Sequence, residues 1–195
     1  MKSRDYYYWE AKRLGYKSRA SFKLLQINER FYIIRRGYVV LDLGASPGGW
    51  SQVALEIVGE NGMVIAVDVK PVKVKGVVFI KGNVYNEGIL DRIREKVDYV
   101  DVVLSDMSPK ISGISSLDHA RSVDLAERAL YMAEKLLRER GHMVVKVFQG
   151  DMLNNFLKKC RNGFELVKVH KPKASSRDSP EVYVVCKRFK FFNTP

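Results

Sequence analysis

The chain has few of the residues that hold metal ions or cross-link secreted proteins. Its 195 residues include two cysteines and three histidines. Cys160 and Cys186 show no metal-ligand spacing and are too few for a disulfide framework, so we expect two reduced thiols, with one disulfide between them as the alternative. Because the histidines are scattered along the sequence, we expect neither a catalytic triad nor a metal site.

Long apolar runs are absent as well. No stretch approaches the roughly 20 apolar residues that a membrane span needs, and the first ten residues lack the apolar core of a signal peptide. We therefore expect a cytoplasmic protein with no membrane partner. The length suffices for one well-buried α/β domain and is short for two, so we expect a single domain over residues 1–195 and, by default, a monomer.

Positive charge is what the chain has in excess. The net charge is +12, and it is unevenly divided along the sequence. Residues 1–38 carry a net +7, residues 39–145 a net −2 and residues 146–195 a net +7. The lysine-rich surface of a thermophilic protein would raise charges of both signs without separating them in this way. The division favours a nearly neutral core with two basic ends that bind a polyanion such as RNA.

The basic N-terminal segment, about residues 1–37, also contains many aromatic residues. Rings interleaved with lysines and arginines suit base stacking combined with phosphate contacts, as in the binding of single-stranded RNA. The alternative is a tail whose rings pack on the domain. The rings concerned belong to Tyr6, Tyr7, Tyr8, Trp9 and Tyr16.

A short helix is expected late in this segment, with Ser21 or Ser18 as its N-cap. Its apolar spacing predicts one buried face and one face near the solvent. The side chains expected to point inward are those of Phe22, Leu25 and Ile27, and those expected near the surface are Arg19, Lys23 and Arg30.

From residue 38 onward, apolar strands alternate with helical patterns. This alternation predicts an α/β fold in which helices cover both faces of a seven-stranded, mostly parallel sheet. The segment between the last two strands is too short for a crossover helix, so we expect those strands to form an antiparallel hairpin. The expected strands are residues 38–43, 63–68, 77–81, 100–105, 142–148, 164–170 and 182–187, and the expected helices are residues 49–58, 86–96, 117–140 and 152–161.

A glycine-rich turn follows the first of these strands and leads into a helix. Glycines let the backbone pass close to a ligand, and the helix offers unpaired N–H groups at its start, which is typical of a nucleotide-like cofactor site. The spacing is Gly-x-x-x-Gly-Gly, whereas dinucleotide sites have Gly-x-Gly-x-x-Gly, which argues against a nicotinamide dehydrogenase. The turn consists of Gly44, Ala45, Ser46, Pro47, Gly48, Gly49 and Trp50.

Three further polar residues lie at the strand ends, where the active sites of α/β sheets form. Asp68 ends the second strand and can accept hydrogen bonds from both hydroxyls of a ribose. Asp106 follows the fourth strand, and Lys146 interrupts the apolar fifth strand. A buried ammonium group needs a partner, and Asp106, one strand away, is the expected one.

Lys146 has two interpretations. It is either half of a buried ion pair that links two strands, or a base that removes a proton from a substrate. The second role requires Lys146 to lose its own proton near neutral pH, which Asp106 alone opposes and desolvation or another cation favours. The catalytic interpretation therefore requires a second cation near Lys146.

Five segments of the chain resemble the RrmJ/FtsJ family of S-adenosylmethionine-dependent RNA 2′-O-methyltransferases. They occur in the order and spacing of that family and span residues 17–187, which is nearly the whole chain. The resemblance implies the Rossmann-like fold of class I methyltransferases, with an antiparallel last strand. The segments are residues 19–24, 42–52, 105–109, 144–150 and 179–183.

The resemblance implies a catalytic tetrad of Lys23, Asp106, Lys146 and Glu181. In such a tetrad Lys146 orients and deprotonates a ribose 2′-hydroxyl, and Asp106 fixes the position of the lysine. Lys23 and Glu181 hold the tetrad and the substrate ribose in place. Lys23 is also the second cation that the catalytic interpretation of Lys146 requires.

The resemblance also implies S-adenosylmethionine as cofactor, with no metal. It places the methionine part against the turn at residues 44–50 and near Asp106, the ribose on Asp68, and the adenine around Asn83 and Val84. Members of the family often have Asp in place of Asn83. Because an amide has both a donor and an acceptor, Asn83 can still bind the adenine amino group through its carbonyl, and we expect a changed affinity for the cofactor.

The implied substrate is RNA, most specifically a uridine of large-subunit (23S) ribosomal RNA, and the implied partner is ribosomal RNA or the large ribosomal subunit. Methylation of transfer RNA by the same chemistry is one alternative. Another is a non-catalytic RNA-binding factor of ribosome assembly that keeps the fold as a scaffold. The complete tetrad argues against the scaffold.

Overall fold

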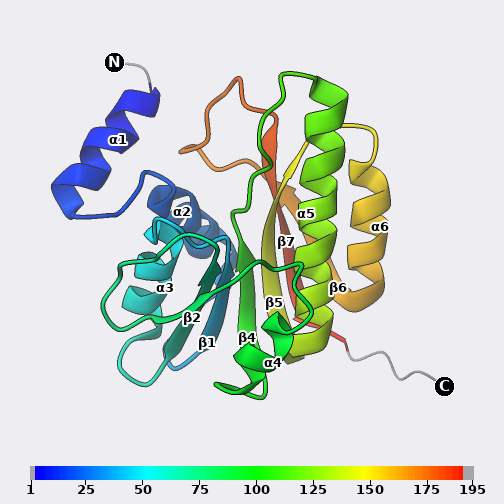
Figure 1. Ribbon diagram of the computed structural model, residues 1–195. Coiled ribbons are helices and arrows are strands. Elements are labelled where there is room, and N and C mark those ends of the chain that lie inside the picture. The colour runs from blue at the N-terminus through cyan, green and yellow to red at the C-terminus, as the bar shows by residue number, and fades with distance from the viewer. Residues whose placement is uncertain (1–2, 191–195) are drawn as a thin grey trace.

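Seven strands form one sheet in the order β3-β2-β1-β4-β5-β7-β6, with helices on both of its faces (Figure 1). The computed structural model describes residues 3–190. Strands β1 to β5 pair in parallel, and β7 is antiparallel to both β5 and β6. This confirms the predicted Rossmann-like sheet and its final hairpin. The strands are β1 (Val39–Leu43), β2 (Met63–Asp68), β3 (Val78–Lys81), β4 (Val100–Ser105), β5 (Leu137–Phe148), β6 (Phe164–His170) and β7 (Glu181–Phe189).

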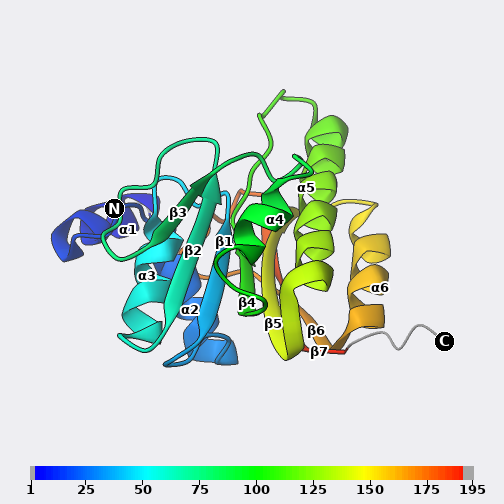
Figure 2. The same ribbon diagram turned by 60° about the horizontal axis from the view of Figure 1, so that its bottom comes forward.

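The helices form two layers around the sheet. Helices α2 and α3 cover one face and α4, α5 and α6 the other, while α1 extends away from the sheet beside α2 (Figures 1 and 2). No helix within residues 3–190 is both long and apolar enough to cross a membrane. The helices are α1 (Ser3–Leu14), α2 (Ser21–Phe31), α3 (Gly49–Val58), α4 (Ile89–Arg94), α5 (Ser115–Leu136) and α6 (Leu153–Gly163).

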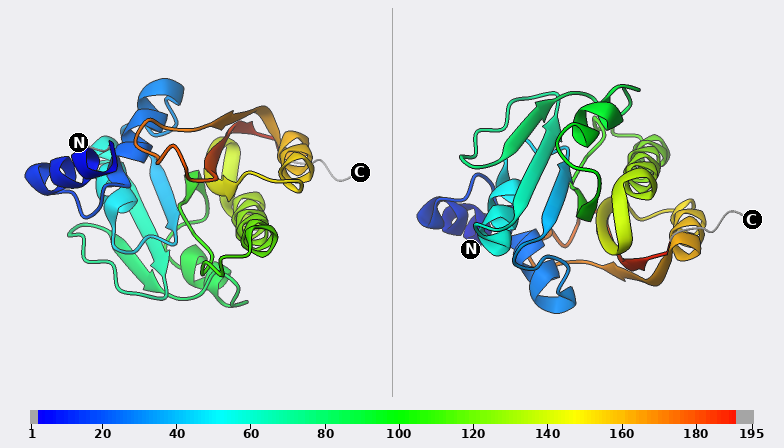
Figure 3. Two further views of the ribbon diagram at one scale, coloured as in Figure 1. Left: turned by 90° about the horizontal axis from the view of Figure 1, so that it is seen from above. Right: turned by 90° about the horizontal axis from the view of Figure 1, so that it is seen from below.

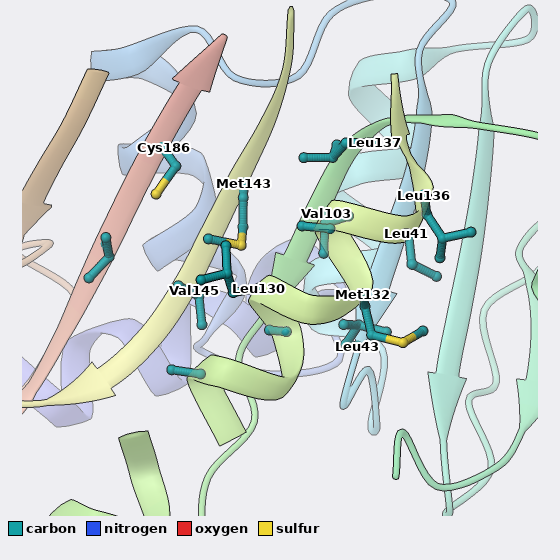
Figure 4. Close-up of a cluster of buried hydrophobic side chains, with 14 of the residues drawn as sticks. Leu41, Leu43, Val103, Leu130, Met132, Leu136, Leu137, Met143, Val145 and Cys186 are labelled. Atoms are coloured by element: carbon teal, nitrogen blue, oxygen red, sulfur yellow. The ribbon is translucent and has the colours of Figure 1, made fainter. Parts of the chain in front are cut away.

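Alternate residues of the strands supply the two cores, because successive side chains point to opposite faces of a sheet. Val40 packs with the α2 and α3 layer. Leu41 and Leu43 pack with the α5 layer, where Figure 4 shows them near Val103 and Met132. The sheet is therefore buried on both sides, which leaves its strand ends as the place for a site.

Two helices differ from their predicted bounds. Helix α5 ends at Leu136 instead of residue 140, because Leu137 already pairs with Val100 as the start of β5, and Arg140 has a left-handed φ of 63°. Helix α4 is shorter than predicted, since hydrogen bonds from Asn86 and Ile89 close turns ahead of it. Helix α1 lies in the first part of the N-terminal segment, ahead of the one helix that the sequence predicted there.

The predicted start of α2 is also corrected. Ala20 stands at the N-cap position, with no side-chain hydrogen bond, and Ser21 is the first helical residue. The Ser21 hydroxyl donates to the Gly49 carbonyl at 3.0 Å, which ties α2 to the glycine turn. Lys23, predicted near the surface, is 7% exposed. It is buried because its ammonium group contacts polar side chains at the carboxyl ends of the parallel strands.

Candidate active site

Lys146 lies near the carboxyl end of β5, on the face that α2 and α3 cover, and is 6% exposed. Its Nζ donates to the main-chain oxygen of Asp106 at 2.7 Å. The same Nζ lies 3.2 Å from Asp106 Oδ1 and 3.8 Å from Glu181 Oε1. The geometry agrees with the predicted pairing of Lys146 with Asp106 and adds a second carboxylate.

Lys23 reaches the same site from α2. Its Nζ donates to Glu181 Oε2 at 3.1 Å, so the two lysines contact different oxygens of one carboxylate. Burial alone would raise the pKa of Glu181, but the charges of Lys23 and Lys146, with hydrogen bonds from Lys23 and Ser179, hold it below its ordinary value. The four residues predicted as a tetrad therefore lie in one cluster, with Glu181 ionised between two cations.

Tyr183 is a member of this cluster that the sequence reasoning missed. It is fully buried and lies opposite Lys146 in the β5–β7 register. Its hydroxyl accepts a hydrogen bond from Lys23 Nζ at 3.1 Å and donates one to Asp106 Oδ1 at 2.7 Å. Its position two residues after Glu181 was the available signal, because residues i and i+2 of a strand share a face.

The glycine turn borders a cavity of about 610 Å³ at the same sheet edge. This is within the size range of cofactor pockets. The predicted cofactor residues that line it are Gly44, Ser46, Asp68, Asn83, Val84 and Asp106. A small adjoining hollow of about 50 Å³ is lined by Gly44, Ala45, Ser46, Pro47, Gly49 and Trp50.

Two residues of the turn serve the fold. Gly48 lines neither of these two spaces; it is the N-cap of α3 at a φ of 113°, a conformation that side chains disfavour. Trp50 is 3% exposed, packs on the Tyr183 ring at 5.6 Å between centroids and donates to the Ala20 carbonyl. Both place the turn relative to the tetrad.

Asp68 and Asn83 keep part of their hydrogen-bonding capacity. Asp68 accepts one backbone N–H on each oxygen, from Ser46 at 2.9 Å and from Lys70 at 2.7 Å. A carboxylate has about four lone-pair sites, so acceptors remain for ribose hydroxyls. Asn83 Oδ1, the atom expected to bind the adenine amino group, already accepts from the Tyr85 N–H at 3.0 Å, so one lone pair of this carbonyl remains for a base.

Asp42 is a second residue that the sequence reasoning did not assign to the site. It is fully buried beside the turn; Ser51 donates to its Oδ2 at 2.6 Å, and its Oδ1 has no hydrogen-bond partner. Burial, with the charges of Asp106 and Asp68, raises the pKa of Asp42 to about 7. A buried, unpaired carboxyl oxygen lining the small hollow suits a positively charged ligand group, which fits a sulfonium or amino-acid cofactor.

The described residues offer no arrangement for metal binding: between residues 3 and 190, no three His, Cys, Asp or Glu side chains are grouped so as to hold an ion. Cys160 and Cys186 are buried and free. The charged groups of the tetrad contact one another at this end of the sheet.

Known proteins resemble this chain over nearly its whole length. The family model described as FtsJ-like methyltransferase matches residues 16–189. Two curated relatives are named ribosomal RNA large subunit methyltransferase E: that of Methanocaldococcus jannaschii is 51% identical over 96% of this chain and 80% of its own length, and that of Archaeoglobus fulgidus is 49% identical over 97% and 99%. A solved structure described as a ribosomal RNA methyltransferase of Plasmodium falciparum has a TM-score of 0.80 at 28% identity, covering 89% of this chain and 98% of that one. The chain belongs to the FtsJ-like methyltransferase family.

Proposed function

We propose that the protein transfers the methyl group of S-adenosylmethionine to a ribose 2′-hydroxyl of RNA. The observation that carries this proposal is the buried Lys146, which contacts Glu181 and is held by Asp106, a residue that lines the glycine-turn cavity. Membership of a methyltransferase family makes methyl transfer the reaction in which a lysine held at this place would act.

Residues around the larger cavity would hold the cofactor. The turn at residues 44–50 would contact its methionine part, Asp68 its ribose hydroxyls, and Asn83 with Val84 its adenine. The unpaired Oδ1 of Asp42 would face its positive charge. When bound, the cofactor supplies a methyl group that a positively charged sulfur already activates, so this chemistry needs no metal.

Lys146 acts as the base in this proposal. In its uncharged form Lys146 would accept the proton of the ribose 2′-hydroxyl, and the bound cofactor would supply the methyl group that this oxygen receives. Lys146 leaves the step as an ammonium ion and passes the proton to solvent. Asp106 fixes Lys146 through two contacts, and Lys23 balances the charge of Glu181, so that Lys146 does not face both carboxylates alone.

For the substrate, we propose a uridine of large-subunit (23S) ribosomal RNA. The names of the two curated relatives support ribosomal RNA, and the basic ends of the chain support a polyanion. In this proposal residues 1–195 form one catalytic domain, and the basic segment of residues 1–37 helps to grip the RNA. Methylation of transfer RNA and a non-catalytic assembly factor remain as the competing outcomes.

The test is methyl transfer from labelled S-adenosylmethionine to M. jannaschii large-subunit ribosomal RNA transcribed in vitro, followed by mapping of 2′-O-methyl groups. The substitution Lys146→Met nearly keeps the volume of the buried side chain and removes the amine that would act as the base. We expect the rate to fall at least about 100-fold, with cofactor affinity measured by calorimetry nearly unchanged. Lys168→Met, at an exposed lysine of β6, is the matched control.

Each outcome decides between the alternatives. A normal rate for Lys146→Met would contradict its role as base. Cofactor binding without transfer to any RNA would indicate the assembly factor, and transfer confined to transfer RNA would replace the proposed substrate.

A further inference from the structure

A second cavity, of about 420 Å³, lies on the other side of the tetrad. It is bounded by the loop between β4 and α5 and by the loop between β6 and β7, which both rise at the upper edge of the sheet in Figure 1 and are seen from above in Figure 3. Glu181 of the tetrad lines it, and Ser108 lines both this cavity and the glycine-turn cavity. The two cavities therefore meet at Ser108, and each is lined by one tetrad residue, Asp106 in the first and Glu181 in the second.

Side chains of α5 hold one wall of this second cavity in place. Asp118 accepts hydrogen bonds from the Ser112 N–H at 2.8 Å, the Ser112 hydroxyl at 2.7 Å and the Gly113 N–H at 3.1 Å. These three bonds fix the loop that carries Ile111. The wall is preformed, which reduces the entropy that a ligand must remove on binding.

The floor of the cavity is held in the same way. His119 accepts the Met152 N–H on Nε2 at 3.0 Å, so its Nδ1 carries the proton and donates to the Phe148 carbonyl at 3.1 Å. Gly150 has no side chain, and a Cβ there would lie 2.6 Å from the His119 ring. The histidine therefore supports the floor and has no free nitrogen for catalysis.

The groups left free in the cavity suit a flat heterocycle. Ile111 is 61% exposed and Pro180 is exposed, so both offer apolar surface. The side-chain amide of Gln149 has no hydrogen-bond partner among residues 3–190, and it presents both a donor and an acceptor. A nucleobase needs this combination, because its faces are apolar and its edge is polar.

Displacement at a methyl carbon requires the attacking oxygen on the side opposite the leaving sulfur. If the glycine-turn cavity holds the methyl donor, the acceptor enters from the other side of the tetrad. We propose that the second cavity binds the base of the acceptor nucleotide, with Ile111 and Pro180 against its faces and Gln149 at its edge. This inference rests on the proposed function and adds the residues that select the nucleotide.

A base in this cavity is unstacked from its neighbours. The substrate is therefore a nucleotide in a single-stranded or looped part of the RNA, or one that can rotate out of a stack at low cost. A nucleotide held in a continuous helix would present its ribose without filling the cavity.

The test compares Ile111→Ser and Gln149→Ala with matched controls. Ile114→Ser changes an isoleucine of the same loop that is 59% exposed and does not line the cavity, and Asn155→Ala removes an exposed amide on α6. With the transcribed M. jannaschii RNA, we expect the KM for RNA to rise about tenfold in each cavity variant. Cofactor affinity by calorimetry and the controls should stay near wild type.

A second measurement uses a synthetic oligoribonucleotide that spans the mapped methylation position, with and without the base at that ribose. The wild type should bind the intact RNA more tightly, and Ile111→Ser should lose most of this difference. Equal KM values in wild type and both cavity variants, or no preference of the wild type for the intact RNA, would overturn this inference alone. Absence of transfer by the wild type would overturn the proposed function together with it.

Discussion

The hydroxyl of Tyr183 links Lys23 to the pair of Asp106 and Lys146 in the candidate active site. It accepts a hydrogen bond from Lys23 and donates one to Asp106, which in turn holds Lys146. Burial and the nearby charges of Asp106 and Glu181 raise the pKa of Tyr183 well above its ordinary value, so the phenol keeps its proton and donates to Asp106 at any working pH. Tyr183 thus acts as a positioning residue.

We expect Tyr183→Phe to lower kcat for RNA methylation by about 10- to 100-fold, because hydrogen bonds to charged groups contribute roughly 1.5–3 kcal/mol. The KM for the cofactor should change little, since Tyr183 does not line its cavity. Tyr99→Phe, at a residue that is 57% exposed, is the control. An unchanged kcat for Tyr183→Phe would leave Tyr183 with a packing role alone. The same conclusion would follow if Tyr99→Phe lowered kcat and thermal stability as much as Tyr183→Phe does.

Asp42 makes the stability of the protein depend on pH. Its pKa of about 7 in the folded protein exceeds the ordinary 3.8, so the unfolded chain gives up this proton at lower pH. The folded state therefore loses stability through Asp42 as the pH rises from about 4 to about 7. Asp42→Asn removes this titration. When the pH rises from about 4 to about 7, we expect the wild type to lose a few kcal/mol of unfolding free energy relative to the variant.

Denaturant unfolding at a series of pH values measures this difference. Asp98→Asn, at an exposed carboxylate, is the control and should follow the wild-type curve. Curves for Asp42→Asn and wild type that run parallel would mean that Asp42 is ionised throughout in the folded protein.

Individual residues differ in how far the sequence predicted them. The pairing of Lys146 with Asp106 was predicted from a charged residue in an apolar strand. It required only that the fourth and fifth strands lie side by side. Lys23 was predicted near the surface because helical periodicity is judged from apolar side chains alone. It carries no information on a buried carboxylate partner. Tyr183 was missed because the expected strand began at residue 182 and left out Glu181, which shares its face in β7. Asp42 was missed because the sequence of its strand does not show that its carboxylate borders a hollow.

Helix α1 presents its aromatic rings in two ways. Tyr7 packs on Phe22 with ring centroids 5.2 Å apart, and its hydroxyl accepts a hydrogen bond from Gln26. Tyr8 and Trp9 are 46% and 59% exposed, and the ammonium group of Lys12 lies over both rings. Packing on the domain therefore explains Tyr7 and leaves the exposed rings free for RNA.

We expect the double variant Tyr8→Ala, Trp9→Ala to bind RNA at least about tenfold more weakly, because stacking contributes roughly 1–3 kcal/mol per base. Fluorescence anisotropy with a labelled single-stranded RNA measures the affinity. Tyr99→Ala removes a similarly exposed ring just before β4 and should have no effect. The same dissociation constant for both variants would refute RNA stacking by α1.

The elements themselves were largely predictable. Helix α3 and strands β2, β4 and β6 have the expected bounds, because an apolar strand or amphipathic helix between glycines or turn residues leaves little choice. The errors lie where pairing with a distant strand decides the end of an element, as at Leu137, which pairs with Val100. Helix α1 was not predicted, because its aromatic residues stand next to one another and do not recur at helical spacing.

At the scale of the molecule, the place of β7 creates the site. The sequence predicted that β6 and β7 form a hairpin, and the structure inserts β7 between β5 and β6. This insertion sets Tyr183 opposite Lys146 and Glu181 opposite Phe148. The neighbours of a strand depend on the order of the whole sheet, so local pattern could predict the hairpin but not the contact that completes the tetrad.

The same arrangement brings the two basic ends of the sequence together. The Ala174 N–H, in the loop between β6 and β7, donates to the Gln26 side chain of α2 at 3.0 Å. Lys17 lies before α2, with its Cγ 3.9 Å from where a Cβ of Gly48 would be, and Lys173 lies in the loop. Two basic segments that are remote in sequence thus contact each other.

We therefore expect RNA binding to weaken steeply with salt, and Lys17→Ala and Lys173→Ala each to reduce the slope of log affinity against log salt by about 0.7, the value for one phosphate contact of a single strand. Lys96→Ala changes an exposed lysine between α4 and the start of β4 and should leave the slope unchanged. Anisotropy titrations between about 50 and 300 mM salt measure these slopes. If all three variants shifted affinity equally without changing the slope, the positive charge would serve solubility, and the RNA would be held by stacking and base contacts instead.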